Sequence, residues 1–131
     1  MMRRLSMANI ILLHQKLIDQ TGGRHGIRDM NLIESAINRA FATFDGNDLY
    51  EMIEDKIAAI TFGLVNNHGF VDGNKRIGVA VMILLLKLNG YTLQYSQEDL
   101  IVLGTSIADG SMAEVDVKDW LIQHKKSSLI P

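Results

Sequence analysis

The chain has 131 residues, 47% of them apolar and 21% charged, which is typical of one folded globular domain and excludes an intrinsically disordered chain. Thirteen basic and 15 acidic residues give a net charge of −2, so no overall positive field favours nucleic acid as a partner. The sequence contains no cysteine, which excludes disulfides, a thiolate nucleophile and cysteine-based zinc sites. We therefore expect a single domain over residues 1–131.

The first half of the chain shows the apolar spacing of helices. Residues 7–20 predict one helix, which ends before a glycine-rich segment, 22–29, that is expected to form a small β-hairpin or a flexible flap. Residues 31–44 and 49–67 predict two more helices. The apolar stripe of the first of these two extends to Phe44.

The start of the helix predicted over residues 31–44 carries a capping signal. Asn31 is followed three positions later by Glu34, a spacing that resembles a capping box. We therefore expect Asn31 to be the N-cap of this helix.

The helix predicted over residues 74–88 is apolar on nearly all sides and closes at Asn89-Gly90, a favourable left-handed C-cap. A helix of this kind in a globular chain is buried, so we expect it at the centre of the fold. Its apolar run, 77–86, is far shorter than the roughly 20 residues that span a bilayer. The apolar run at 10–13 is too short for a signal peptide. A cytoplasmic protein without membrane contact is expected.

The last third of the chain predicts two more helices. Residues 91–95 alternate like a strand but have no clear partner. Ser96 and Asp99 have the spacing of a capping box and open a helix that ends near Asp109. A final helix contains residues 117–122. Together the elements predict an all-α domain of about six helices around the buried central helix.

Several residues outside the central loop are interpreted as structural. His14, His25 and His124 lack metal-ligand spacing and are expected to be surface or partly buried histidines. Trp120 is expected to anchor the last helix, and residues 125–128 to form a solvated polar tail.

The nine residues 68–76, His-Gly-Phe-Val-Asp-Gly-Asn-Lys-Arg, place a candidate base, a carboxylate, a glycine and two cations at the start of the central helix. A helix N-terminus binds phosphate because its first N–H groups are unpaired and its dipole is positive there. Lys75 and Arg76 are unfavourable beside that dipole by about 0.3–1 kcal/mol each, and a bound polyphosphate would reverse this effect. Each cation alone is explained as solvated charge, but the combination favours phosphoryl or nucleotidyl transfer.

Four residues of this loop have a structural and a chemical interpretation. His68 is either a C-terminal cap of the preceding helix or a general base. Asp72 is either the N-cap of the central helix or a ligand of Mg²⁺. Gly73 permits a positive φ and a close approach of a ligand. Asn74 offers an amide to the site or is itself the cap.

The spacing of these residues resembles the active-site motif of the Fic/Doc family, H-x-F-x-(D/E)-G-N-G-R-x-x-R, and the similarity extends over nearly the whole chain. Lys75 stands where adenylyl-transferring Fic enzymes have glycine, and Val79 where they have a second arginine. Both departures resemble the Doc subgroup, the toxins of addiction modules. The inhibitory (S/T)-x-x-x-E-(G/N) motif of many Fic proteins has no match here.

The resemblance implies a Fic/Doc helical fold and a protein kinase that moves the γ-phosphate of ATP, with Mg²⁺, to a threonine of elongation factor Tu and so stops translation. By the same resemblance His68 deprotonates the acceptor hydroxyl, Asp72 coordinates Mg²⁺ and Arg76 stabilises the transferring group. The phosphates would be held by Gly73, Asn74, Lys75 and Arg76. Segment 22–29 is expected to align the target peptide by strand addition.

The resemblance also implies a partner, a small antitoxin whose disordered tail folds against this domain and inhibits it. Two other functions stay open on the sequence alone. One is a Fic-type nucleotidyltransferase that attaches AMP or another nucleotide to a hydroxyl. The other is a catalytically silent binding module of the same fold. A nuclease is disfavoured by the net charge and by the single acid in the motif.

Overall fold

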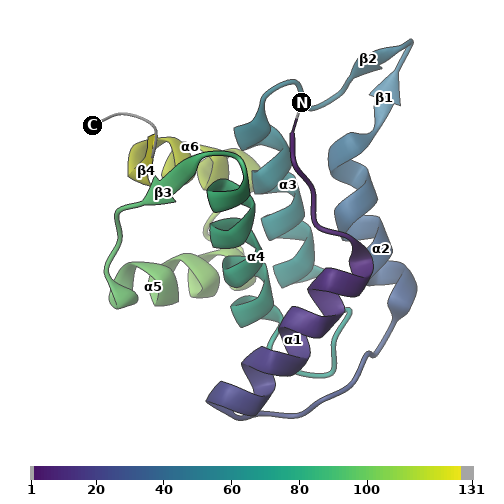
Figure 1. The fold of residues 1–131 in the computed structure, drawn as a ribbon, viewed down its shortest axis with the longest axis vertical. Helices are drawn as coiled ribbons and strands as arrows, with labels where there is room; N and C mark the ends of the chain where they lie inside the picture. The colour runs from purple at the N-terminus through teal and green to yellow at the C-terminus, as the bar shows by residue number, and fades with distance from the viewer. Residues whose placement is uncertain (1, 128–131) are drawn as a thin grey trace.

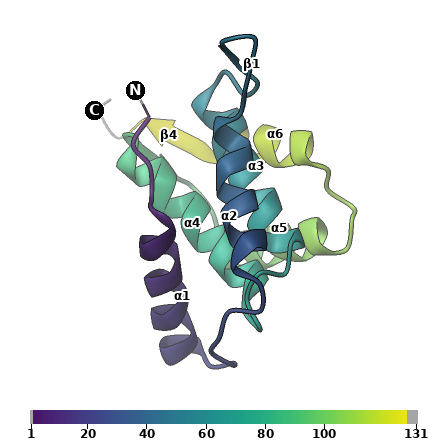
Figure 2. The ribbon, with the colours of Figure 1, turned by 90° about the vertical axis from the view of Figure 1, so that its right-hand side faces the viewer.

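The computed structural model describes residues 2–127 and contains, within them, six α-helices. The helices are α1 (Met7–Thr21), α2 (Met30–Asn38), α3 (Ile53–Asn66), α4 (Asn74–Leu88), α5 (Gln97–Ala108) and α6 (Glu114–His124). α4 lies at the centre, with α1 on one side and α5 and α6 on the other (Figures 1 and 2). The prediction of an all-α domain of about six helices around a buried helix is confirmed. Among the described helices, none is long and apolar enough to cross a bilayer.

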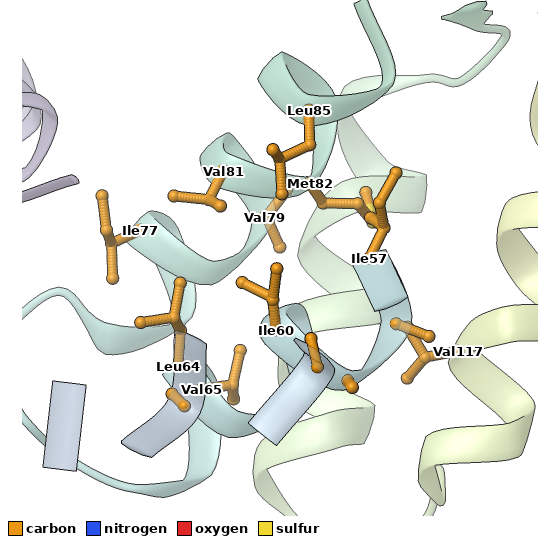
Figure 3. Close-up of a cluster of buried hydrophobic side chains, with 14 of the residues drawn as sticks. Ile57, Ile60, Leu64, Val65, Ile77, Val79, Val81, Met82, Leu85 and Val117 are labelled. Atoms are coloured by element: carbon orange, nitrogen blue, oxygen red, sulfur yellow. The ribbon is translucent and has the colours of Figure 1, made fainter. Parts of the chain in front are cut away.

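The core forms where α3 and α4 pack against each other. Figure 3 shows the buried side chains of the two helices facing one another, with Val117 of α6 closing the cluster. The helices approach closely at Gly78 of α4, where an added Cβ would lie 2.6 Å from Cγ2 of Val65. This tight contact fixes the ends of α3 and α4, and therefore the loop that joins them.

The capping signals of the sequence are partly confirmed. The Ser96 hydroxyl accepts from the N–H of Asp99, and the Asp99 carboxylate accepts from the N–H of Ser96, at 3.1 and 2.9 Å. The capping box expected at Asn31 is wrong. The N-cap of α2 is Asp29, whose carboxylate accepts from the N–H of Asn31 at 2.9 Å.

The helix predicted over residues 31–44 ends early, and Phe44 is not in the core. α2 passes into a 3-10 turn, η1 (Arg39–Phe41), and then into a two-stranded hairpin of β1 (Thr43–Phe44) and β2 (Asn47–Asp48). Asp45 and Gly46 turn the hairpin with φ of 55° and 81°, as a type I′ Asp-Gly turn requires. The hairpin projects from the body of the protein (Figure 1) and leaves Phe44 73% exposed. The next helix accordingly begins at residue 53 and not at 49.

The strand expected at residues 91–95 has a partner after all. β3 (Tyr91–Leu93) pairs antiparallel with β4 (Lys125–Ser127), so the tail that was expected to be solvated is part of a sheet as far as Ser127. Ser128 lies outside the described residues. Lys125 contributes to the pairing, since its Nζ lies 4.1 Å from the centre of the Tyr91 ring.

Candidate active site

The loop between α3 and α4 carries most of the predicted site residues and begins at His68. The C-cap of α3 is Asn67, and His68 follows it at the next position, just beyond the end of the helix. His68 has a positive φ of 53° and an exposed side chain. Its backbone is held by Arg28, whose Nε donates to the His68 carbonyl at 2.6 Å. The backbone of His68 is therefore fixed, while its imidazole can be reached from solvent.

The glycine-rich segment 22–29 pairs with this loop and not with itself. Ile27 and Phe70 form an isolated antiparallel bridge, and the N–H of Val71 donates to the carbonyl of Gly26 at 3.0 Å. The small hairpin considered for this segment is therefore not formed there. The segment instead lies along the site loop and contributes backbone groups to it.

Asn74 holds the loop in its shape. Its amide oxygen accepts from the N–H of Phe70 at 3.1 Å, and its amide nitrogen donates to the carbonyl of Phe70 at 3.0 Å. Neither Asn74 nor Asp72 is the N-cap of α4; that position belongs to Gly73, in the left-handed conformation with φ 78°. The amide of Asn74 is thus used within the loop, and Asp72 is available for chemistry.

The Asp72 carboxylate lies among hydrogen-bond donors. Oδ2 accepts from the N–H of Arg24 at 3.0 Å, and Oδ1 accepts from the N–H of Gly73 at 2.8 Å. The Arg24 N–H, followed by the Gly73 N–H and the charge of Arg76, lowers the pKa of Asp72 below its ordinary value of 3.8. The carboxylate is therefore ionised at neutral pH.

Asp72 has the free lone pairs that a ligand of one Mg²⁺ ion needs. A carboxylate has about four lone-pair sites, and the two N–H groups of the loop occupy two of them. Within the described part of the chain, no three His, Asp or Glu side chains cluster as a metal site. One carboxylate plus phosphate oxygens and waters is the ligand set that Mg²⁺ adopts in nucleotide sites.

Arg76 joins the end of α1 to the start of α4. Its Nη1 donates at 2.6 Å to Oγ1 of Thr21 and to the carbonyl of Gly22, and its Nη2 lies 3.8 Å from Oδ1 of Asp72. Gly23 lies against this pair with φ 114°, and a Cβ there would come within 2.7 Å of Asp72 and 2.8 Å of Arg76. Because residue 23 is glycine, only backbone atoms lie at this position beside the charged groups of Asp72 and Arg76.

His14 is a site residue that the sequence analysis missed. It was expected at or near the surface, but it is 2% exposed, its Nε2 lies 2.7 Å from the Asp72 carbonyl and its ring stacks on Phe70 at 3.9 Å. The signal that could have found it is its spacing. His14 lies four residues from both Ile10 and Ile18, in the middle of the buried stripe of α1.

Lys75 lies at the rim of a groove between α1, α4 and α5. The groove has a volume of about 390 Å³, and its wall includes Arg76, Val79, Leu100 and Ile101. Its lining is mainly apolar, with the two cations at one end.

The structure thus brings Asp72, Gly73 and Arg76 into one cluster with the backbone of segment 22–24. His68 and Lys75 lie on the same stretch of chain with exposed side chains. Sequence reasoning missed Thr21 and His14. It expected segment 22–29 at the site as a flap, without the individual contacts of Gly23, Arg24 and Arg28. All five residues come from the N-terminal part of the chain.

The sequence is similar to those of known proteins. A protein-family model described as the Fic/DOC family matches residues 4–86. The chain is similar to "Toxin Doc" of Mycolicibacterium smegmatis, with 42% identity over 72 residues, 55% of each chain, so it spans about half the length of that relative. It is also similar to "Protein kinase doc" of Escherichia phage P1, with 28% identity over 120 residues, 92% of this chain and 94% of that protein.

Proposed function

Because the chain belongs to the Fic/DOC family and to its Doc subgroup, we propose that it is the toxin of a toxin–antitoxin module and transfers the γ-phosphate of ATP to a hydroxyl of a protein substrate. The observation that carries this proposal is the cluster of Asp72 and Arg76 around the start of α4, with His68 exposed on the same loop. By resemblance, the substrate is elongation factor Tu in the cytoplasm, and its modification stops translation.

In the proposed reaction His68 accepts the proton of the acceptor hydroxyl, and the hydroxyl oxygen forms a bond to the γ-phosphorus. The bond from that phosphorus to the bridging oxygen of ADP breaks, and ADP leaves with the electron pair. Mg²⁺, held by Asp72 and by phosphate oxygens, would neutralise phosphate charge when bound. Arg76 and the first N–H groups of α4 are suited to the remaining phosphate charge. Most of the catalysis would come from positioning and electrostatics.

Nucleotidyl transfer is the alternative reaction, and Val79 disfavours it. Val79 is buried and borders the apolar groove, at the position where the Fic motif has its second arginine. Without that arginine the chain lacks one of the two guanidinium groups that would bind a polyphosphate. Lys75 also replaces the glycine that, in the Fic motif, leaves room for the polyphosphate.

A catalytically silent binding module is the second alternative. The Asp72 carboxylate is kept ionised by its neighbours, and the His68 side chain is open to solvent. A module that only held a partner would need neither property.

The groove between α1, α4 and α5 supports the proposal of an antitoxin partner. An amphipathic helix can lie with its apolar face in such a groove, and an acidic residue at its end would meet Lys75 and Arg76. We therefore place the neutralising tail of the antitoxin in this groove, where it would also restrict access to the start of α4.

The experiment that tests the reaction uses ATP labelled at either the α- or the γ-phosphate, with Mg²⁺ and purified bacterial elongation factor Tu. Label from the γ-phosphate alone on the factor, absent with His68→Ala, is the expected result. Label from the α-phosphate would replace the kinase with nucleotidyl transfer. No label from either position would contradict the proposed substrate and leave the binding module to be tested with cell lysates.

A further inference from the structure

We propose that His14 is a positioning residue of the site, which orients the peptide plane between Asp72 and Gly73 and through it the Asp72 carboxylate. This inference rests on the proposed function, since it concerns the residue that would hold Mg²⁺. It assigns a role to a buried polar group in α1 that takes no part in the reaction itself.

The hydrogen bond of His14 defines its tautomer. Its Nε2 lies 2.7 Å from the carbonyl oxygen of Asp72, and a carbonyl oxygen can only accept. Nε2 therefore carries the proton and donates it, and in the neutral ring Nδ1 is the unprotonated nitrogen. The ring is fixed by stacking on Phe70, with the two planes inclined by 14°.

The peptide plane that His14 holds has two functional ends. Its carbonyl, from Asp72, accepts from His14, and its N–H, from Gly73, donates to Oδ1 of Asp72 at 2.8 Å. A peptide unit is planar, so fixing the carbonyl also fixes the direction of the N–H. Without the His14 donor the plane could rotate, and the carboxylate would lose one of the two N–H groups that orient it.

The His14 ring lies close to the backbone of the loop. A Cβ added to Gly73 would come within 3.4 Å of the His14 Nε2 and 3.1 Å of Ile18. Burial of an imidazole within an apolar stripe costs free energy unless its N–H is hydrogen-bonded. A residue with only a packing role at this position would be apolar, as Ile10 and Ile18 are one turn away on either side.

The test compares His14→Phe, which keeps a ring on Phe70 but has no N–H, with His14→Gln, which restores a donor. Ile10→Ala serves as the control, because Ile10 is equally buried in the same stripe and borders a small cavity with Arg4 and Leu85 away from the site. Each protein is examined by thermal unfolding, by calorimetric titration with Mg²⁺–ATP without any protein substrate, and by NMR for amide exchange of Gly73 and the His14 tautomer.

We expect wild-type His14 to be protonated on Nε2, and His14→Phe to weaken Mg²⁺–ATP binding by about tenfold, the effect of losing one well-placed hydrogen bond. The Gly73 amide should exchange faster in His14→Phe, and His14→Gln should recover part of the affinity. Ile10→Ala should lower the Tm and leave the affinity unchanged. Wild-type affinity and Gly73 exchange in His14→Phe would overturn the inference alone. Failure of the wild-type protein to bind Mg²⁺–ATP would overturn the proposed function as well.

Discussion

At the scale of single residues, Gly23 has to be glycine because the side chains of Asp72 and Arg76 lie against it. Alanine at Gly22 or Gly23 would be strained by about 1–3 kcal/mol, because both positions have positive φ. At Gly22 an added Cβ meets nothing within 4 Å, whereas at Gly23 it meets Asp72 and Arg76. We therefore expect both variants to lose stability and only Gly23→Ala to lose Mg²⁺–ATP affinity.

Chemical denaturation gives the loss of stability for the two glycine variants, and calorimetric titration with Mg²⁺–ATP gives the affinity. Gly22→Ala is the matched control, since it has the same kind of backbone strain without the collision. Equal affinities of the two variants would contradict a site built around Asp72 and Arg76.

Asp72 makes the stability of the protein depend on pH in a defined direction. Its pKa in the folded protein is lowered, first by the Arg24 N–H and then by the Gly73 N–H. A carboxyl whose pKa is lowered by folding stabilises the folded state above the unfolded pKa, near 3.8, and this contribution disappears as the pH falls through the folded pKa. Asp72→Asn should thus be less stable than wild type at neutral pH and equally stable in strong acid.

Thermal unfolding of the wild type and Asp72→Asn between pH 7 and pH 2 measures this convergence. A stability difference that persists unchanged into strong acid would show that the asparagine disturbs packing and not charge. Because Asp72 is ionised throughout the neutral range, any loss of the proposed transfer activity in mildly acidic solution is expected to come from another group.

At the scale of secondary-structure elements, the close contact of α3 and α4 sets the position of the site loop. Gly78 lies in the helix interior, where alanine is intrinsically better by about 1 kcal/mol. Its Cβ would nevertheless lie 2.6 Å from Val65 and 3.2 Å from the Thr61 carbonyl. We expect Gly78→Ala to lower the free energy of unfolding by about 1–3 kcal/mol, as overpacked cores do.

Gly104 in α5 is the matched control for Gly78. It is also buried in a helix, but a Cβ there would make only ordinary contacts of 3.6 Å with Lys75 and Val79. Gly104→Ala should be neutral or should stabilise the protein by up to about 1 kcal/mol. Urea unfolding of both variants distinguishes the effects, and a stabilised Gly78→Ala would mean that α3 and α4 separate without cost.

Local signals explain which elements could be predicted from the sequence. Helix α4 was predicted with its observed limits because its apolar run is bounded by a glycine on each side. The end of α2 was not, because an apolar Phe44 continued the helical pattern past a turn that Asp45 and Gly46 specify. The pairing of β3 with β4 joins segments more than 30 residues apart, and no local pattern reports such a pairing.

The same distinction holds for the site. His68, Asp72 and Arg76 lie within nine residues, so their type and spacing alone are enough to predict them as site residues. His14, Gly23 and Arg28 act through contacts made 40 to 58 residues away in the sequence or by backbone shape. Only the approach of α1 and segment 22–29 to the loop reveals them.

At the scale of the whole molecule, the site is assembled from two distant parts of the chain. Arg76 donates hydrogen bonds to Thr21 and Gly22 at the end of α1, which are 55 and 54 residues away in the sequence. The N–H of Arg24 donates to the carboxylate of Asp72, which is 48 residues away. The groove along α1, α4 and α5 begins at this junction. A partner that fills the groove therefore contacts the elements that hold the charged cluster, and can act on the site without reaching His68.

The exposed side chain of Ile101 allows this relation to be tested. Ile101 lines the groove and is 63% exposed, while Val102, 55% exposed on the same helix, is not part of the lining. Burial of a large aliphatic side chain by a partner contributes about 1.5–3 kcal/mol, which corresponds to roughly 10- to 150-fold in affinity. Ile101→Asp should therefore weaken antitoxin binding by at least tenfold, and Val102→Asp should bind as the wild type does.

The measurement pairs calorimetric titration of each variant with the proposed antitoxin and growth of cells that produce both proteins. Growth should stop with Ile101→Asp and continue with Val102→Asp, because only the first variant escapes neutralisation while both keep the charged cluster intact. If both variants are neutralised like the wild type, the antitoxin acts at another surface. If both escape, the aspartate disturbs α5 itself, which thermal unfolding of the free variants would detect.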